Sequence, residues 1–395
     1  MRIQRLLSVL LWSCAALAPL VACGAERTVP IIYSTDLYHP PDDPDDTFDT
    51  ATLFAMKEFD IRGIILDNGL GRQVENPVNV PFKHRRGRPP LEQLMHITGR
   101  NVKYAPGLPQ RLTSAADKGL EQPKEYQGGV ALLLSCLRES REKVTLFSNG
   151  SCRDFAAAFN REPELFKQKV KALYCIAGTV LDQGDVAQED FNVELDPWAF
   201  FRMFETEVPS HWCGTRPKMS ERAPGGLYST CFWVHQQRVI RAGTEPVENY
   251  FIYALTASPA DPLAFLGSGF QRIPLGRAFA GDGGRFMWCT APLCHAAGRN
   301  IYRRGIADFL ALQPEDAQKA GLAGQKIELY DFVPVTVVPK QLPKVLTLDF
   351  KTPVNNPQTL AFRRPVTETD YRTVMESVLA NLMAELGRDE GKKPQ

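Results

Sequence analysis

Apolar and polar positions follow each other along the first half of the chain in a pattern that predicts strands alternating with helices. Short, nearly continuous apolar runs, the pattern of buried strands, occur at residues 31–36, 61–68, 143–150, 172–178 and 208–215. Between these runs, apolar residues recur at helical spacing at residues 50–59, 90–99, 125–140 and 151–170. Strands separated by helices predict an α/β fold, with an open, mostly parallel, doubly wound sheet that carries helices on both faces.

The pattern is weaker in the second half of the chain. Residues 229–242 have the spacing of an amphipathic helix, and Asp261 followed by Pro262 marks the start of another helix. Residues 264–345 are rich in Gly, Pro and Arg and show no clear period. We therefore predict irregular structure in that region.

Regular structure is expected again near the end of the chain. Residues 346–350 read LTLDF and predict a last strand, and residues 367–386 predict an amphipathic final helix packed on the sheet. No internal repeat and no linker separates these elements from the first half. Residues 30–390 are therefore expected to form a single domain.

The first residues resemble a bacterial secretory signal. A basic start, MRIQR, precedes an apolar run that is shorter than the roughly 20 residues needed to span a bilayer. The sequence LVAC before Gly24 resembles a lipobox and favours a lipid anchor at Cys23, while cleavage after Ala25 to give a soluble periplasmic protein is the alternative. We expect residues 1–22 to be a signal peptide, and the protein to be exported to the periplasm or to the outer membrane as a lipoprotein.

Composition and charge narrow the function classes. The 395 residues are 44% hydrophobic with a formal charge of +1, which suits a globular protein and argues against a nucleic-acid partner. Seven of the nine cysteines follow the leader, and their odd number leaves at least one thiol free. Cys289 and Cys294 are close enough in sequence for a local disulfide, but sequence does not fix the pairing. No Cys or His spacing indicates zinc.

An acidic segment follows the first predicted strand. Asp36 lies where that strand should end, and five more aspartates crowd the turn and the next helical turn: Asp42, Asp43, Asp45, Asp46 and Asp49. Ligands bind beyond the carboxyl ends of strands in open α/β sheets, and clustered oxygen ligands favour a hard ion such as Ca²⁺. The alternative is a solvated acidic loop in which Asp45 or Asp46 caps the helix. The EF-hand spacing is absent.

Several segments together resemble the nucleoside hydrolase family, the inosine-uridine preferring N-ribohydrolases. Residues 34–46 partly match the family's D-x-D-x-x-x-D-D, with Ser34 in place of the first Asp and an insertion from Leu37 to Pro44. Residues 141–165 resemble the family's V-T-L-V-A-x-G-P-L-T-N segment. Residues 171–214 echo its I-x-M-G-G-A, G-N-V, E-F-N and D-P-E-A-A blocks in order, and ADPLAF resembles H-D-P-L-A.

The resemblance implies a Ca²⁺ site and a ribose site. The ion would be held by Asp36, Asp46, Asp261 and the main-chain carbonyl of Asn149, with sugar hydroxyls and a water completing a shell of about eight oxygens. The ribose hydroxyls would be bound by Asp45, Asp190 and Asn192. All of these residues lie at predicted strand ends or in the loops that follow them.

The implied reaction is hydrolysis of the N-glycosidic bond of a ribonucleoside or a related ribosyl compound. Carboxylates would stabilise the positive charge that develops on the sugar, and Asp36 would accept a proton from the attacking water. The family's His before the last metal Asp is Ala260 here, so the acid for the leaving base is not identified. We rank His235 first, within a predicted helix, ahead of the other candidates: Tyr38, His39 and His84.

Three hypotheses remain open from the sequence. The first is a nucleoside hydrolase, and the second is a hydrolase of the same fold that acts on another ribosyl or glycosyl compound. The third is a Ca²⁺-dependent sugar-binding or nucleoside-binding protein without catalysis. Members of this family often form dimers or tetramers, so the resemblance leaves a homo-oligomer open, and the sequence defines no interface.

Overall fold

The computed structural model describes residues 28–39, 41, 44–67, 87–178, 190–215, 228–267, 283–341, 345–349 and 359–388. The predicted signal peptide and Cys23 lie outside the described residues, as do Asp42, Asp43 and His84. Within the described ranges, no helix is both long enough and apolar enough to cross a membrane.

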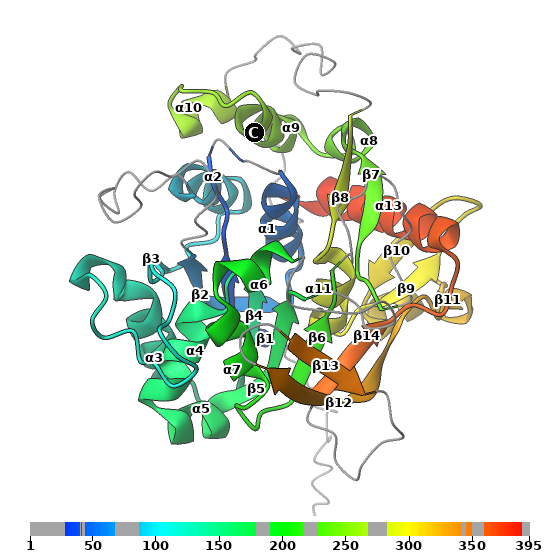
Figure 1. The fold of residues 1–395 in the computed structure, drawn as a ribbon. Coiled ribbons are helices and arrows are strands. Elements are labelled where there is room, and N and C mark those ends of the chain that lie inside the picture. Colours follow the sequence, from blue (N-terminus) through cyan, green and yellow to red (C-terminus); the bar gives the residue numbers. More distant parts are fainter. Residues whose placement is uncertain are drawn as a thin grey trace, which may run out of the picture.

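A nine-stranded sheet forms the centre of the described structure (Figure 1). Its strands, in spatial order, are β13 (Val345–Asp349), β12 (Asp331–Gln341), β14 (Thr359–Arg363), β6 (Ser210–Cys213), β5 (Val170–Ile176), β4 (Val144–Asn149), β1 (Val29–Thr35), β2 (Phe59–Leu66) and β3 (Tyr104–Pro106). Every neighbouring pair from β14 to β3 is parallel, whereas β12 runs antiparallel to both of its neighbours. The predicted α/β fold with a mostly parallel sheet is confirmed.

At one position in the sheet, the direction in which successive strands are added reverses. From β1 the chain proceeds outward to β2 and β3, and it then returns to β4 and proceeds the other way through β5 to β6. In a doubly wound sheet, the crevice for a ligand opens where this direction reverses. Here the reversal lies between β1 and β4, whose carboxyl ends are in register, with Thr35 opposite Asn149.

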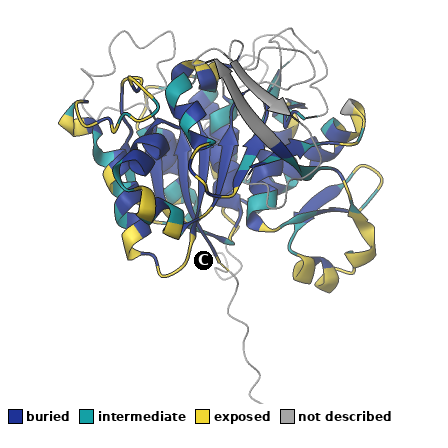
Figure 2. Cartoon of the chain, turned by 60° about the horizontal axis from the view of Figure 1, so that its bottom comes forward, coloured by how far each residue is buried: buried dark blue, intermediate teal, exposed yellow. Residues whose placement is uncertain are grey.

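Helices cover both faces of the sheet and create two cores. One face carries α1 (Asp45–Ala55), α2 (Arg88–Thr98), α9 (Glu245–Leu255), α11 (Thr290–Ala297) and α13 (Glu368–Glu385). The other carries α3 (Gly128–Glu139), α4 (Arg153–Arg161), α5 (Pro163–Lys169) and α7 (Pro197–Met203). Strand β1 serves both, since Ile31 and Tyr33 join the first core and Ile32 the second. Figure 2 shows the strands between the helices as buried.

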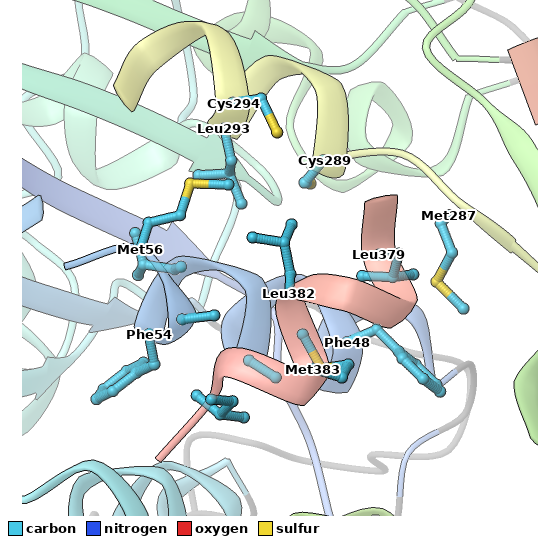
Figure 3. Close-up of a cluster of buried hydrophobic side chains, with 14 of the residues drawn as sticks. Phe48, Phe54, Met56, Met287, Cys289, Leu293, Cys294, Leu379, Leu382 and Met383 are labelled. Carbon is cyan, nitrogen blue, oxygen red and sulfur yellow. The ribbon is translucent and has the colours of Figure 1, made fainter. Parts of the chain in front are cut away.

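The last helix packs beside the first. Figure 3 shows Phe48 of α1 and Leu382 and Met383 of α13 within one apolar cluster, to which α11 contributes Leu293. All four side chains are fully or almost fully buried. Each contributes about 1.5 to 3 kcal/mol by leaving water, so this cluster fixes α1 on the sheet.

The structure corrects the helix predicted at residues 229–242. The chain there forms a strand, β7 (Phe232–His235), and then a short helix, α8 (Gln236–Ile240). Phe232 and Val234 are buried while the residues between and after them are more exposed, which is the two-residue period of a strand. Antiparallel pairing with β8 (Gly284–Met287), which is distant in sequence, decides the outcome over local helical spacing.

Residues 264–345 are not irregular as predicted. The described part of this region contains β8, α11, β9 (Asn300–Arg303), β10 (Phe309–Leu312), α12 (Pro314–Lys319), β11 (Lys326–Ile327) and β12. These elements are too short to show a period in the sequence. The strand predicted at residues 346–350 corresponds to β13, but β14 follows it and had not been predicted.

A buried aromatic cluster contains two histidines. The Tyr174 hydroxyl lies 2.7 Å from His295 Nδ1, and the His211 ring stacks on Tyr174 with a centroid distance of 4.3 Å. Burial, and for His211 also the nearby His295, lower the pKa of His211 to about 3, while burial lowers the pKa of His295 to about 4. Both imidazoles are therefore neutral in the folded protein near neutral pH.

We expect this cluster to make the fold sensitive to acid. As pH falls below about 6.5, the unfolded chain binds protons at both imidazoles while the folded chain does not. The free energy of unfolding therefore decreases until about pH 4 through His295 and until about pH 3 through His211. At pH 5 the loss is about 2 kcal/mol per histidine. Urea unfolding at pH 7 and pH 5 measures it. His211→Phe should reduce the difference and the exposed control His235→Gln should not; equal pH dependence in all three proteins would contradict this account.

Candidate functional site

The carboxyl ends of three neighbouring strands meet at the reversal point of the sheet. The Asp36 amide, directly after β1, donates to the Asn149 carbonyl at the end of β4 with an N to O distance of 3.2 Å. On the other side of β1, the Asp67 amide after β2 donates to the Thr35 carbonyl at 2.8 Å. Parallel pairing therefore places Asp36, Asp67 and Asn149 along one short edge.

Asp46 reaches this edge from the start of α1. Its Oδ1 accepts hydrogen bonds from the Thr35 hydroxyl at 2.9 Å and from the Asn149 side-chain amide at 2.7 Å. The N-cap position of α1 is Pro44, and no side chain caps the helix. The alternative role of Asp45 or Asp46 as a helix cap is therefore wrong. Both residues lie inside the first turn of α1, where the helix dipole favours negative charge.

The carboxyl groups at this edge are strongly coupled. Desolvation, followed by the charges of Asp46 and Asp67, raises the pKa of Asp36 well above its usual range. Desolvation and the charges of Asp45 and Asp49 do the same to the pKa of Asp46. Asp36 and Asp46 also hydrogen-bond to each other. Two carboxyl groups in contact need a shared proton or a cation between them.

These donors partly fit a hard cation. Asp36 and Asp46 are partly exposed carboxylates, and the Asn149 carbonyl adds a neutral oxygen. The described part of the chain contains no group of three or more His, Cys, Asp or Glu side chains placed to hold a metal ion. The pair therefore offers hard oxygen donors to a cation, but among the described residues no third acidic side chain joins it to complete a metal-binding group.

Asp261, the third predicted acidic ligand, lies on a neighbouring loop. It is exposed and caps α10 (Pro262–Leu266), with its Oδ1 accepting from the Ala264 amide at 2.8 Å. The same loop contacts the segment after β1, since His39 Nε2 lies 2.9 Å from the Ser258 carbonyl. The His39 ring also stacks on Tyr253 at 4.2 Å. The loop that contains Asp261 therefore contacts the segment that follows Asp36, but the two carboxylates do not form a common metal-binding group.

Asp190 and Asn192 lie beyond the end of β5, the next strand along the sheet. Asp190 caps α6 (Phe191–Leu195) by accepting from the Val193 amide at 3.0 Å, and the Thr215 hydroxyl donates to its other oxygen. Burial raises the pKa of Asp190, against the effect of Thr215. The Asn192 side-chain amide donates to the Ile176 carbonyl at 2.8 Å, which fixes the orientation of its carboxamide.

A buried ion pair holds the carboxyl end of α6 in place. Arg153, the first residue of α4, donates through Nε to Asp196 at 2.9 Å, and both side chains are completely buried. The same guanidinium donates to the carbonyls of Leu108 at 2.8 Å and Leu195 at 2.9 Å. Because Leu195 is the last residue of α6, Arg153 links the loop after β4 to the helix that carries Asn192.

Sequence reasoning missed part of this arrangement. Asp67 accepts from the Ser151 amide at 2.6 Å, and Gly150 lies so close that a Cβ there would be 2.6 Å from Asp67 Oδ2. Asp67 directly follows a buried strand, so the strand-end rule that identified Asp36 could have identified it. Thr215 and Arg153 carried no such signal, because their partners are distant in sequence.

The structure distinguishes between the candidate acids for the leaving base. His235, ranked first, does not lie in a helix: it ends β7 with its side chain exposed, and its amide donates to Glu376 at 2.9 Å. His39 instead lies three residues after Asp36 and packs on the loop that contains Ala260. His84 lies outside the described residues.

Comparison with known proteins finds the same fold in solved structures. Two solved structures share the fold: a purine-preferring ribonucleoside hydrolase from Gardnerella vaginalis, with a TM-score of 0.51, 14% identity, and coverage of 90% of this chain and 99% of that one, and a plant nucleoside hydrolase, with a TM-score of 0.50, 15% identity, and coverage of 91% and 98%. No curated protein matches the sequence.

The sequence itself decides the family. Residues 31–255, more than half of the chain, match the inosine-uridine preferring nucleoside hydrolase family. This segment contains Asp36 directly after β1, Asp46 in α1, Asn149 at the end of β4, and Asn192 in α6. The protein is therefore a member of the nucleoside hydrolase family, a hydrolase that acts on N-glycosyl bonds.

Proposed function

We propose that the protein is a Ca²⁺-dependent hydrolase that cleaves the N-glycosidic bond of a ribonucleoside or a related ribosyl compound. The observation that carries this proposal is the contact between the Asp36 and Asp46 carboxyl groups at the reversal point of the sheet. A protein keeps two acidic groups in such a place at a cost in stability. A cation and a developing positive charge on a sugar both compensate for that cost.

The metal belongs to this proposal. Members of the family depend on a metal ion in general. In this chain Asp36, Asp46 and the Asn149 carbonyl would hold Ca²⁺, with Asp261 as the further ligand implied by the family resemblance. A bound Ca²⁺ would neutralise the carboxylate pair and make a water at the site easier to deprotonate. Asp261 would have to leave its position at the start of α10 to take part.

The chain's own residues supply the remaining steps. Asp36 would accept the proton of the attacking water, because it directly follows β1 at the point where the ligand crevice opens. Asp45, Asp190 and Asn192 would orient the ribose hydroxyls. Asp190 and Asn192 are already held by Val193 and Ile176, so little side-chain entropy would be lost when a sugar binds.

The leaving base requires either a proton donor or an intrinsically good leaving group. Ala260 cannot supply a proton. We infer that His39 is a better candidate than His235, because His39 packs against the Ala260 loop and follows Asp36 closely. A substrate whose base leaves without protonation would make this residue dispensable.

Calorimetry on the protein, first with Ca²⁺ and then with a panel of nucleosides, tests the proposal. We expect saturable Ca²⁺ binding followed by continuous heat from turnover of at least one nucleoside. Saturable sugar binding without turnover would contradict hydrolysis, and the absence of Ca²⁺ binding would contradict the metal site.

The same titration decides the role of Asp261. Asn is also a good helix cap, so Asp261→Asn should preserve α10. If Asp261 is a ligand, Ca²⁺ affinity should fall by about tenfold or more. Asp316→Asn, on the surface of α12, is the matched control. Equal affinity in both variants would remove Asp261 from the site.

A further inference from the structure

Two buried cysteines meet beside the candidate site. The Sγ atoms of Cys152 and Cys175 are 3.2 Å apart, and the two residues are only 1% and 3% exposed. Cys175 lies near the end of β5, directly opposite Ser148 of β4. The Cys152 thiol also donates to the Ser148 hydroxyl at 3.3 Å. The side chains of Cys152, Ser148 and Cys175 therefore gather on one face of two paired strands.

Cys152 has a left-handed backbone conformation, and its side chain contacts Ser148 and Cys175. After β4, the chain turns through Gly150 and Ser151, and Cys152 then adopts a φ of 59° directly before α4. This left-handed conformation costs a residue with a Cβ roughly 1 to 2 kcal/mol, and glycine would avoid the cost. A side chain at this position faces Ser148 and Cys175, and here it is a thiol.

We propose that Cys152 and Cys175 form a disulfide bond that joins the loop after β4 to β5. The bond length of a disulfide is about 2.05 Å, so the sulfur atoms need to approach by about 1.2 Å, within the range of a small change in side-chain torsion. The proposal is independent of the proposed substrate and metal.

The oxidant is a small or protein disulfide, such as glutathione disulfide. One cysteine thiolate attacks this disulfide, forms a mixed disulfide and releases the first glutathione thiolate. The second cysteine thiolate then attacks the protein sulfur and releases the second. The two cysteines lose two protons and two electrons in total, and one glutathione disulfide becomes two glutathione molecules.

Because both cysteines are buried in the folded protein, the disulfide is expected to form during folding. Both sulfur atoms are shielded in the folded chain, so an oxidant reaches them before α4 packs on the sheet. Export, as proposed from residues 1–22, would supply an oxidising compartment at that time. The other five described cysteines, all of them buried, remain thiols in this scheme: Cys136, Cys213, Cys231, Cys289 and Cys294.

The bond would restrain the loop that carries the Asn149 carbonyl. Asn149 precedes Cys152 by one turn of chain, and the Ser151 amide within that turn already donates to Asp67. A covalent link at Cys152 closes the turn from its far end. Backbone amides at residues 149–153 should therefore exchange hydrogen more slowly in the oxidised protein than in the reduced protein.

Refolding tests the pairing directly. The full chain, reduced and denatured, is refolded in a glutathione redox buffer, its thiols are alkylated in denaturant, and its peptides are analysed by mass spectrometry. We expect one peptide pair linked through Cys152 and Cys175, and alkylation of the five other described cysteines. Alkylation at both Cys152 and Cys175, or a different dominant linkage, would overturn the proposal.

Thermal unfolding provides a second measurement. Reduction of the oxidised protein should lower the midpoint by about 5 °C, because the loop between the two cysteines is no longer closed. Cys152→Ser and Cys175→Ser should each abolish this shift. Cys136→Ser, a buried control whose thiol contacts the Arg62 carbonyl, should retain it. An equal shift in Cys152→Ser and in the wild type would contradict the assignment, and the mass analysis of the wild type stands even if a variant fails to fold.

Discussion

Asp36→Asn is expected to lower kcat for nucleoside hydrolysis by about 10³-fold while the protein stays folded. The amide has the shape of the carboxylate but cannot accept a proton from water. The substitution also removes a charge that Asp46 and Asp67 repel, so the thermal midpoint without added metal should not fall. Steady-state kinetics with the best nucleoside from the calorimetric panel, together with a thermal unfolding curve, measure both effects.

The matched control for this variant is Asp60→Asn. Asp60 lies near the amino end of β2, opposite the carboxyl edge of the sheet, in a partly exposed ion pair with Arg62. Its substitution should leave kcat unchanged. A kcat for Asp36→Asn within twofold of the wild-type value would exclude Asp36 as the proton acceptor. A loss of activity together with a large fall in the thermal midpoint would instead show that Asp36 acts through the fold.

Arg153→Ala is expected to reduce the free energy of unfolding by about 3 to 5 kcal/mol. The substitution leaves the Asp196 carboxylate buried without its guanidinium, and it also removes the donors to Leu108 and Leu195. Urea unfolding followed by circular dichroism measures the loss. Because Arg153 connects α4 to α6, the affinity for ribose is expected to fall as well.

Arg138→Ala is the control for this prediction. Arg138 pairs with Glu162 on the surface, where about half of the Arg138 side chain is exposed. Exposed pairs contribute less than about 1 kcal/mol, so stability should hardly change. Arg153→Lys adds a second comparison, because lysine keeps the charge but cannot reach three acceptors with a planar fork. If Arg138→Ala and Arg153→Ala reduced the free energy of unfolding equally, the buried ion pair of Arg153 would contribute no more stability than the exposed pair of Arg138.

The sheet and one edge of the site could be predicted from sequence for a physical reason. Strands covered on both faces are continuous apolar runs, and β1, β2, β4 and β5 all show this pattern. Once the strands are located, the residues that follow them lie at the carboxyl edge of a parallel sheet. Asp36 was found in this way, whereas the role of Asn149 came from the family resemblance. The contact between the two residues in the structure follows from strand pairing.

Other features depend on partners that the sequence does not reveal. Strand β7 is four residues long, and its identity depends on pairing with β8 nearly fifty positions later. The side chain of Asp261 caps a helix, a role that its position before Pro262 allows as readily as metal binding. The contact of Cys152 with Cys175 requires a left-handed residue, which no local pattern announces.

The packing of α13 beside α1 has a consequence for synthesis of the chain. The helix that presents Asp46 is covered by side chains from α13, which lies more than 300 positions later in the chain, as Figure 3 shows for Leu382 and Met383. Until α13 has been synthesised, Phe48 and its neighbours lack part of the surface that buries them. Contacts between such distant segments form late and slowly.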